Sequence, residues 1–189
     1  HRGKLVKLMN DLYENSSFYC FEPNKSMNAS LQKIGKNVKV FNYAVGQKNG
    51  EQKILISKID LTHTLSKINK DSLYLKIKNF VITKSEEKVV YKKIKVISLK
   101  NFCKIQKIKR IDFLKVDVEG YEYEVLKGAK EIIKNVKFIM LEVQKNDMYA
   151  NYSKNKIENF LKKNNFILIK SFDFPLMFFK DCIYKKIEN

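Results

Sequence analysis

Apolar residues recur along the chain at spacings that predict helices and strands in alternation. In residues 4–14, Leu5, Leu8, Met9 and Leu12 follow the spacing of one helix face. Further helices are predicted over 24–35, 99–107, 121–135 and 156–165. Short runs rich in β-branched and aromatic residues predict strands over 16–23, 38–46, 47–57, 92–99, 111–118, 136–143, 166–172 and 177–186.

The order of these elements predicts the fold class. Strands that alternate with helices are typical of βαβ units, so we expect one α/β domain over residues 1–189, with a mostly parallel sheet and helices on both faces. The two closing strands are expected to form an antiparallel pair. Residues 58–88 show the least periodicity and are expected to be an irregular excursion over the sheet edge, where substrate loops often lie.

Composition changes this picture little. The 38 basic residues outnumber the 20 acidic ones, for a formal net charge of +18, but only Arg2 and Arg110 are arginines. Sites that grip phosphate or guanine favour the planar arginine fork, so a solvated lysine surface is the preferred interpretation. A nucleic-acid-binding module is kept as an alternative function.

Cysteine usage and hydropathy bear on the compartment. Cys20, Cys103 and Cys182 are odd in number, widely spaced and without a CxxC motif. This pattern favours reduced thiols in a cytoplasmic protein over a disulfide framework or a zinc site. No apolar run reaches the length of a membrane span, roughly 18–20 residues.

Three predicted strands finish in carboxylates. The strand 16–23 ends at Glu22, the strand 111–118 runs into Asp117 and Glu119, and the strand 136–143 carries Glu142 near its end. In an open α/β sheet, ligands bind at the carboxyl ends of the strands, so these acids are expected to converge on one crevice. There they can accept hydrogen bonds from a ribose or act as a general base. Asp117 follows apolar neighbours, where an unpaired charge would be costly.

Other acids near this stretch have simpler interpretations. Glu122 and Glu124 fall in the first turn of a predicted helix, where they would compensate the helix dipole. Asp112 opens its strand at the opposite edge and is expected to be structural. Glu119 fits a functional role or a capping role equally well. The trio of Asp117, Glu119 and Glu142 could hold a hard cation, but no metal site is predicted.

The first residues match half of a nucleotide-binding motif. Gly3 opens the first helix, and Glu22 ends the next strand about twenty residues later, a spacing found in nucleotide-binding βαβ units. An NAD-dependent oxidoreductase would use Glu22 in the same way and is kept as a second alternative.

Four segments carry a resemblance to a known family: FYCFEPN (18–24), NYAVGQKNG (42–50), IDFLKVDVEGYEYEVLKGA (111–129) and FKDCIYKK (179–186). With these segments the chain resembles the FkbM family of S-adenosyl-L-methionine (SAM)-dependent methyltransferases. The resemblance implies a class I, Rossmann-like methyltransferase fold of seven strands, the last of them antiparallel. It also implies that the first strand lies outside this chain, which would begin within the family's first motif.

The resemblance also implies roles for particular residues. His1 and Gly3 would line the methionine end of SAM, and Glu22 would bind its ribose hydroxyls. The adenine would be bordered by Tyr43, Ala44 and Val45. Asp117 and Glu119 would lie beside the sulfonium and the acceptor hydroxyl.

The implied reaction is in-line methyl transfer to a hydroxyl oxygen of a sugar, a glycan or a secondary metabolite. Asp117 is the candidate base, and His63 is a rival because imidazole titrates near neutrality. The DVEG turn and the antiparallel closing pair favour this function over the NAD alternative. The partner is therefore expected to be a small-molecule or glycan acceptor.

Overall fold

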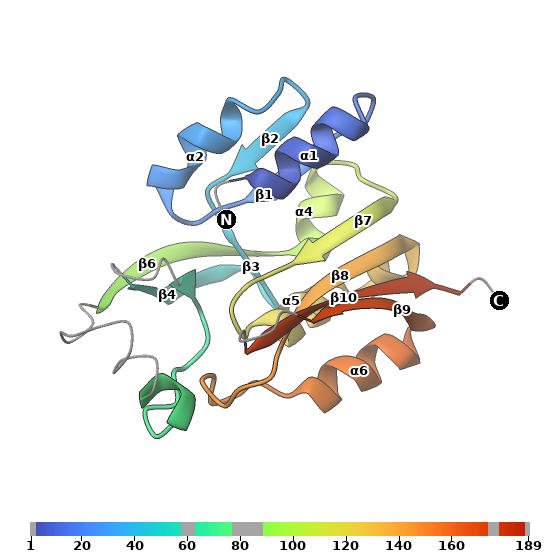
Figure 1. The fold of residues 1–189 in the computed structure, drawn as a ribbon. Helices are drawn as coiled ribbons and strands as arrows, with labels where there is room; N and C mark the ends of the chain where they lie inside the picture. The colour runs from blue at the N-terminus through green and yellow to red at the C-terminus, as the bar shows by residue number, and fades with distance from the viewer. Residues whose placement is uncertain (1–2, 58–62, 77–88, 174–177, 188–189) are drawn as a thin grey trace.

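The computed structural model describes residues 3–57, 63–76, 89–173 and 178–187 (Figure 1). Its helices are α1 (Lys4–Leu12), α2 (Lys25–Gln32), α4 (Leu99–Ile105), α5 (Glu122–Ala129) and α6 (Lys154–Lys163), with a 3-10 helix η1 (Lys130–Asn135). Its first strands are β1 (Phe18–Phe21), β2 (Val38–Phe41), β3 (Ala44–Gly46), β4 (Gly50–Ser57) and β5 (His63–Thr64). The later strands are β6 (Val89–Ser98), β7 (Ile111–Val116), β8 (Val136–Gln144), β9 (Phe166–Asp173) and β10 (Phe179–Lys186).

The strands form three sheets, with the orders β1-β2, β7-β8-β10-β9 and β3-β6-β4-β5. Pairing is parallel in β1–β2, β3–β6 and β7–β8, and antiparallel in the other pairs. The α/β class is as predicted, and β9 and β10 are antiparallel as expected. The expected predominance of parallel pairing is not found among these strands, because β6 returns antiparallel to β4 and β10 lies antiparallel to both of its neighbours.

The predicted strand 38–46 is two strands that belong to different sheets. Asn42 stands between them, and its Nδ2 donates to the carbonyl oxygens of Glu22 and Pro23, each at 2.9 Å. These bonds fix a bend after β2, so β3 leaves the β1–β2 pair and joins β6. A periodic apolar pattern cannot reveal such a bend, because both strands are apolar.

The predicted helix 121–135 also divides in two. α5 ends at Ala129, and Lys130 has φ +41°, after which the chain continues as η1. The apolar residues of this range nevertheless keep to the core side: Val125, Leu126 and Ala129 of α5 and Ile133 of η1 are buried, and Ile132 packs against the core while half-buried.

The main core lies between the β7-β8-β10-β9 sheet and its helices. Along β8, Ile139, Leu141 and Val143 are buried in it, together with Leu126 of α5 and Leu161 of α6. Since side chains of a strand alternate between its faces, Met140 and Glu142 lie on the opposite face, where both are half-buried. Figure 1 shows α6 alongside this sheet, and the strands β4 and β6 at the left of the view.

Helix α5 contacts the β3-β6-β4-β5 sheet at two glycines, Gly128 of the helix and Gly46 of β3. A Cβ placed on Gly128 would lie 2.0 Å from the Gly46 carbonyl oxygen of β3. Only a residue without a side chain allows this approach. The helix that follows the acidic turn is thereby held directly against β3.

Helix α1 forms as predicted, but no residue of it is buried. Leu8 and Leu12, both on its predicted apolar face, are exposed. In the described part of the chain, no helix has both the length and the apolar character needed to cross a membrane.

Candidate active site

The acidic turn follows β7 and has an unusual backbone. Glu119 and Gly120 both have positive φ, at +53° and +87°. A Cβ on Gly120 would lie 2.4 Å from Cγ of Tyr149, so this position needs glycine for both conformation and space. The backbone of this turn is therefore tightly constrained, and it sets the directions in which Asp117, Glu119 and Glu122 leave the chain.

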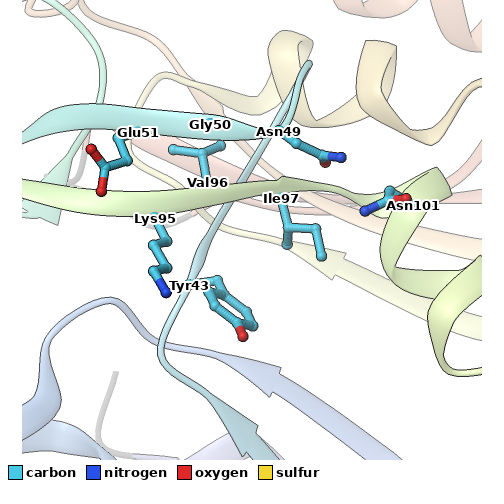
Figure 2. Close-up of a pocket in the computed structure, with 8 residues that line it drawn as sticks. All are labelled: Tyr43, Asn49, Gly50, Glu51, Lys95, Val96, Ile97 and Asn101. Carbon is cyan, nitrogen blue, oxygen red and sulfur yellow. The ribbon is translucent and has the colours of Figure 1, made fainter.

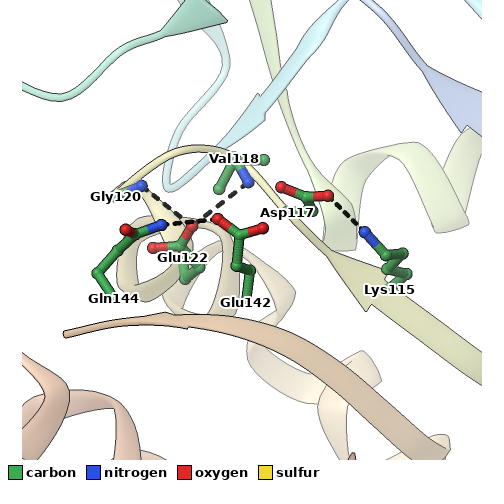
Figure 3. Close-up of polar contacts among 7 residues, drawn as sticks. All are labelled: Lys115, Asp117, Val118, Gly120, Glu122, Glu142 and Gln144. Carbon is green, nitrogen blue, oxygen red and sulfur yellow. Dashed lines mark hydrogen bonds and ion pairs between the residues drawn. The ribbon is translucent and has the colours of Figure 1, made fainter. Parts of the chain in front are cut away.

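Glu122 holds this turn from within the fold. It is the first residue of α5, its exposed fraction is 0%, and its Oε1 accepts hydrogen bonds from the Gly120 N–H at 3.1 Å and the Val118 N–H at 3.3 Å (Figure 3). Burial raises the pKa of Glu122 to about 7, although the backbone donors oppose the shift. The predicted first-turn position is confirmed, but dipole compensation alone does not describe this residue, because its carboxyl group binds the preceding turn.

Three other carboxylates meet at the ends of β7 and β8. Asp117, Glu119 and Glu142 each place an oxygen within 4.8 Å of the others. Burial, followed by the charges of Asp117 and Glu119, raises the pKa of Glu142 to about 8. Its Oε1 also accepts from Gln144 Nε2 at 2.7 Å (Figure 3). The predicted convergence of acidic strand ends is therefore found for these three residues, which we call the carboxylate cluster.

Asp117 is more open to solvent than its apolar neighbours suggested. β7 ends at Val116, so Asp117 lies just beyond the strand, with 28% of its side chain exposed. It forms an ion pair with Lys115 (Figure 3). The cost of an unpaired charge does not arise here, because the lysine two residues earlier supplies a partner.

Sequence reasoning missed Asp181. In the pairing of β8 with β10 it stands directly opposite Glu142. Burial, and then the charge of Asp117, raises the pKa of Asp181, while Lys115 opposes the shift. The available signal was a charged residue inside the otherwise suitable strand FKDCIYKK.

Sequence reasoning also missed Tyr149 and Thr64. Tyr149 donates its hydroxyl hydrogen bond to Glu119 Oε2 at 2.5 Å, and Thr64 Oγ1 donates to the Glu119 carbonyl oxygen at 2.6 Å. The signal for Tyr149 was an aromatic residue within the polar segment QKNDMYAN after a buried strand. Thr64 lies in the segment predicted to be irregular and gave no signal.

A second group of predicted residues lies at the ends of β1 and β2. Glu22 directly follows β1, its N–H donates to the Phe41 carbonyl oxygen, and its Oε1 accepts from the Asn24 N–H at 2.7 Å. Glu22 and Tyr43 therefore follow two adjacent parallel strands. Ala44 is buried, and Val45 packs against the main core.

A pocket of about 340 Å³ opens beside Tyr43 (Figure 2). Besides Tyr43, its lining consists of Asn49, which precedes β4, and residues of β4, β6 and α4: Gly50, Glu51, Lys95, Val96, Ile97 and Asn101. No member of the carboxylate cluster lines it. The structure thus brings Tyr43 to a concave surface, separate from the three acids.

The N-terminal predictions have mixed outcomes. His1 lies outside the described residues. Gly3 does open α1, with φ +72°, and a Cβ there would lie 2.7 Å from side-chain carbons of Leu31 and Ile34. Packing against this region is thus a sufficient reason for glycine, and its contact with a cofactor stays a prediction.

Three further candidates, Asp112, Glu124 and His63, lie in β7, α5 and β5. Asp112 is exposed and pairs with Arg110 at 3.2 Å, at the start of β7, in agreement with a structural role. Glu124 lies 3.5 Å from Lys127 on the surface of α5. His63 falls in β5, and its role as a rival base stays a prediction.

Comparison with known proteins supplies the family. The family model described as the methyltransferase FkbM domain matches residues 4–168. No curated protein and no solved structure matches the chain. The matched range includes the acidic turn, Glu22 and Tyr43, so it spans both groups of candidate residues. The chain belongs to the FkbM methyltransferase family.

Proposed function

We propose that this protein is a SAM-dependent O-methyltransferase that acts on a hydroxyl group of a sugar, a glycan or a secondary metabolite. The observation that carries the proposal is the carboxylate cluster at the carboxyl ends of β7 and β8. This is the edge at which α/β sheets bind their ligands, and carboxylates there suit a reaction that removes a hydroxyl proton.

The residues after β1 and β2 fit the nucleoside part of SAM. Glu22 is half-buried, and the Asn24 N–H fixes one of its oxygens, so its carboxylate has a defined direction. A carboxylate in this place can accept hydrogen bonds from both ribose hydroxyl groups. Tyr43 contributes an aromatic ring to the lining of a pocket, which suits an adenine. Ala44 and Val45 complete this border.

The chemistry divides between the cofactor and the chain. SAM, when bound, supplies a methyl group already activated for in-line transfer to an oxygen. The chain must align the acceptor and take up its proton. Asp117 is exposed enough to meet an acceptor, and its ion pair with Lys115 fixes the direction of its side chain.

Glu142 sets the charge of the cluster. With a pKa of about 8, it holds its proton at neutral pH, so the negative charge is concentrated on its neighbours. A group that stays protonated beside Asp117 limits mutual repulsion and leaves Asp117 as the base.

Calorimetric titration tests the cofactor assignment. SAM and S-adenosylhomocysteine are expected to bind and NAD is not. Saturation by NAD without binding of SAM would instead favour an oxidoreductase. Formation of S-adenosylhomocysteine in the presence of a panel of sugars and glycans would then identify the acceptor class.

A further inference from the structure

The loop after β8 places one buried aromatic residue against the acidic turn. Tyr149 is only 3% exposed, and its hydroxyl donates to Glu119 Oε2 at 2.5 Å. A hydrogen bond to a carboxylate at this distance belongs to the strong, charge-assisted class. Burial, followed by the charge of Glu119, raises the pKa of Tyr149, so the hydroxyl keeps the proton that it donates.

Glu119 is held at its backbone as well as at its side chain. Its φ of +53° is unfavourable for a residue other than glycine, by roughly 1–2 kcal/mol. Thr64, which is 1% exposed, donates to its carbonyl oxygen at 2.6 Å. Two segments distant in sequence therefore fix the conformation of this one residue.

The ring of Tyr149 also packs against Gly120. A Cβ on Gly120 would meet Cβ, Cγ and Cδ2 of this tyrosine at 2.4–2.8 Å. One side chain thus contacts both residues of the turn that have positive φ. A turn with only a structural role would favour glycine or asparagine at position 119, so an acid held there against strain and beside two other acids indicates a task for its carboxylate.

The same loop binds the segment predicted to lie on the substrate side. Tyr149 forms a β-bridge with Ile68, and the Ala150 N–H donates to the Lys67 carbonyl oxygen at 2.9 Å. Ser72 Oγ donates to Asp147 Oδ1 at 2.5 Å. Residues 63–72 and Glu119 are therefore positioned by one loop.

We propose that Tyr149 is a positioning residue, which holds the Glu119 carboxylate in the carboxylate cluster and links its direction to the segment 63–72. This inference rests on the proposed function, because the task of Glu119 is to orient the acceptor hydroxyl beside Asp117. Tyr149 acts only through Glu119. Its hydroxyl should therefore be dispensable when Glu119 is changed.

The test is Tyr149→Phe, which removes the hydroxyl and keeps the ring against Gly120. In protein labelled with carbon-13 at glutamate carboxyl groups, the Glu119 signal is assigned by its loss in Glu119→Gln. Without its donor, the Glu119 carboxyl is expected to titrate about one to two pH units higher. Tyr184→Phe, which removes a buried tyrosine hydroxyl from β10, is the matched control and should leave this signal unchanged. An unchanged Glu119 titration in Tyr149→Phe would overturn the inference.

Methyl-transfer kinetics give the second measurement. Tyr149→Phe is expected to lower kcat about tenfold or more, with SAM affinity within twofold of the original. The double variant Tyr149→Phe/Glu119→Gln should be no slower than Glu119→Gln alone. Additive losses would show that the hydroxyl acts elsewhere and would contradict the positioning role. If SAM fails to bind the unchanged protein, the proposed function fails, whereas the carboxyl titration still decides whether Tyr149 controls Glu119.

Discussion

Glu142 and Asp181 lie directly opposite each other on the antiparallel strands β8 and β10. Both are half-buried acids, and burial raises the pKa of each. Like charges in facing positions destabilise a sheet, so this pair is tolerated most easily while Glu142 keeps its proton. Asp117, Glu119 and Glu122 face the same carboxyl group, and Lys115 is the cation that acts on Asp181.

This pair predicts a pH dependence of stability. The pKa of Glu142 rises from an ordinary 4.5 to about 8 on folding, so between these values the folded state binds the proton that the unfolded state has lost. The free energy of unfolding should therefore fall as pH rises from about 4.5 to about 8. Glu122, with a pKa raised to about 7, adds to the same trend. Urea unfolding at intervals across this range measures the slope.

Glu142→Gln is the companion variant, because it keeps the shape and removes the titration. Its unfolding free energy should exceed that of the unchanged protein at pH 8 and should vary less with pH. An identical slope in the two proteins would contradict the assignment of this dependence to Glu142.

Asp117→Asn should lower kcat about 100-fold or more, since the proposed base is lost while its size is kept. Stability should change little, because the carboxylate is partly exposed and its ion pair is near the surface. Asp112→Asn is the matched control at the other end of β7, where an exposed aspartate also pairs with a cation. Equal turnover in the two variants would exclude Asp117 as the base.

Glu22→Gln should weaken SAM binding about tenfold or more, because hydrogen bonds to a charged acceptor are lost. Calorimetry measures this, with Glu14→Gln as the control, since Glu14 is an exposed acid shortly before β1. SAM affinity that is unchanged in Glu22→Gln would remove the ribose assignment.

Gly120→Ala should lower the free energy of unfolding by about 3 kcal/mol, because it combines backbone strain with a clash against Tyr149. Gly50→Ala separates the two effects. Gly50 also has positive φ, at +149°, but a Cβ there would meet nothing within 4 Å, so only the backbone strain, about 1 kcal/mol, is expected. Losses of equal size would show that Tyr149 gives way to the added methyl group.

Sequence periodicity was sufficient to predict the order of most helices and strands. It also placed carboxylates at the ends of neighbouring strands. The apolar runs around Val116 and Leu141 predicted β7 and β8, and their carboxylates do meet. It could not predict the division into three sheets. That division depends on the bend at Asn42, which is made by hydrogen bonds to Glu22 and Pro23.

The site residues that sequence reasoning missed or misread were missed for one shared reason. The burial of Glu122 and the contact of Tyr149 with Glu119 depend on residues brought together by the turn with positive φ, and no spacing rule describes that turn. In the same way, Asp181 becomes part of the site only through its register with Glu142. Such tertiary pairings cannot be inferred from the periodicity of one segment.

The contact between Gly128 and Gly46 has a consequence for how this sequence can vary. A population of chains randomised at position 128 and sorted for folded protein should retain glycine alone, because even one methyl group would stand 2.0 Å from a backbone oxygen. Glu122 begins the helix that contains Gly128. A larger residue at position 128 would therefore displace α5 and, with it, the Glu122 carboxyl group that binds the acidic turn, although Gly128 itself lies outside that turn.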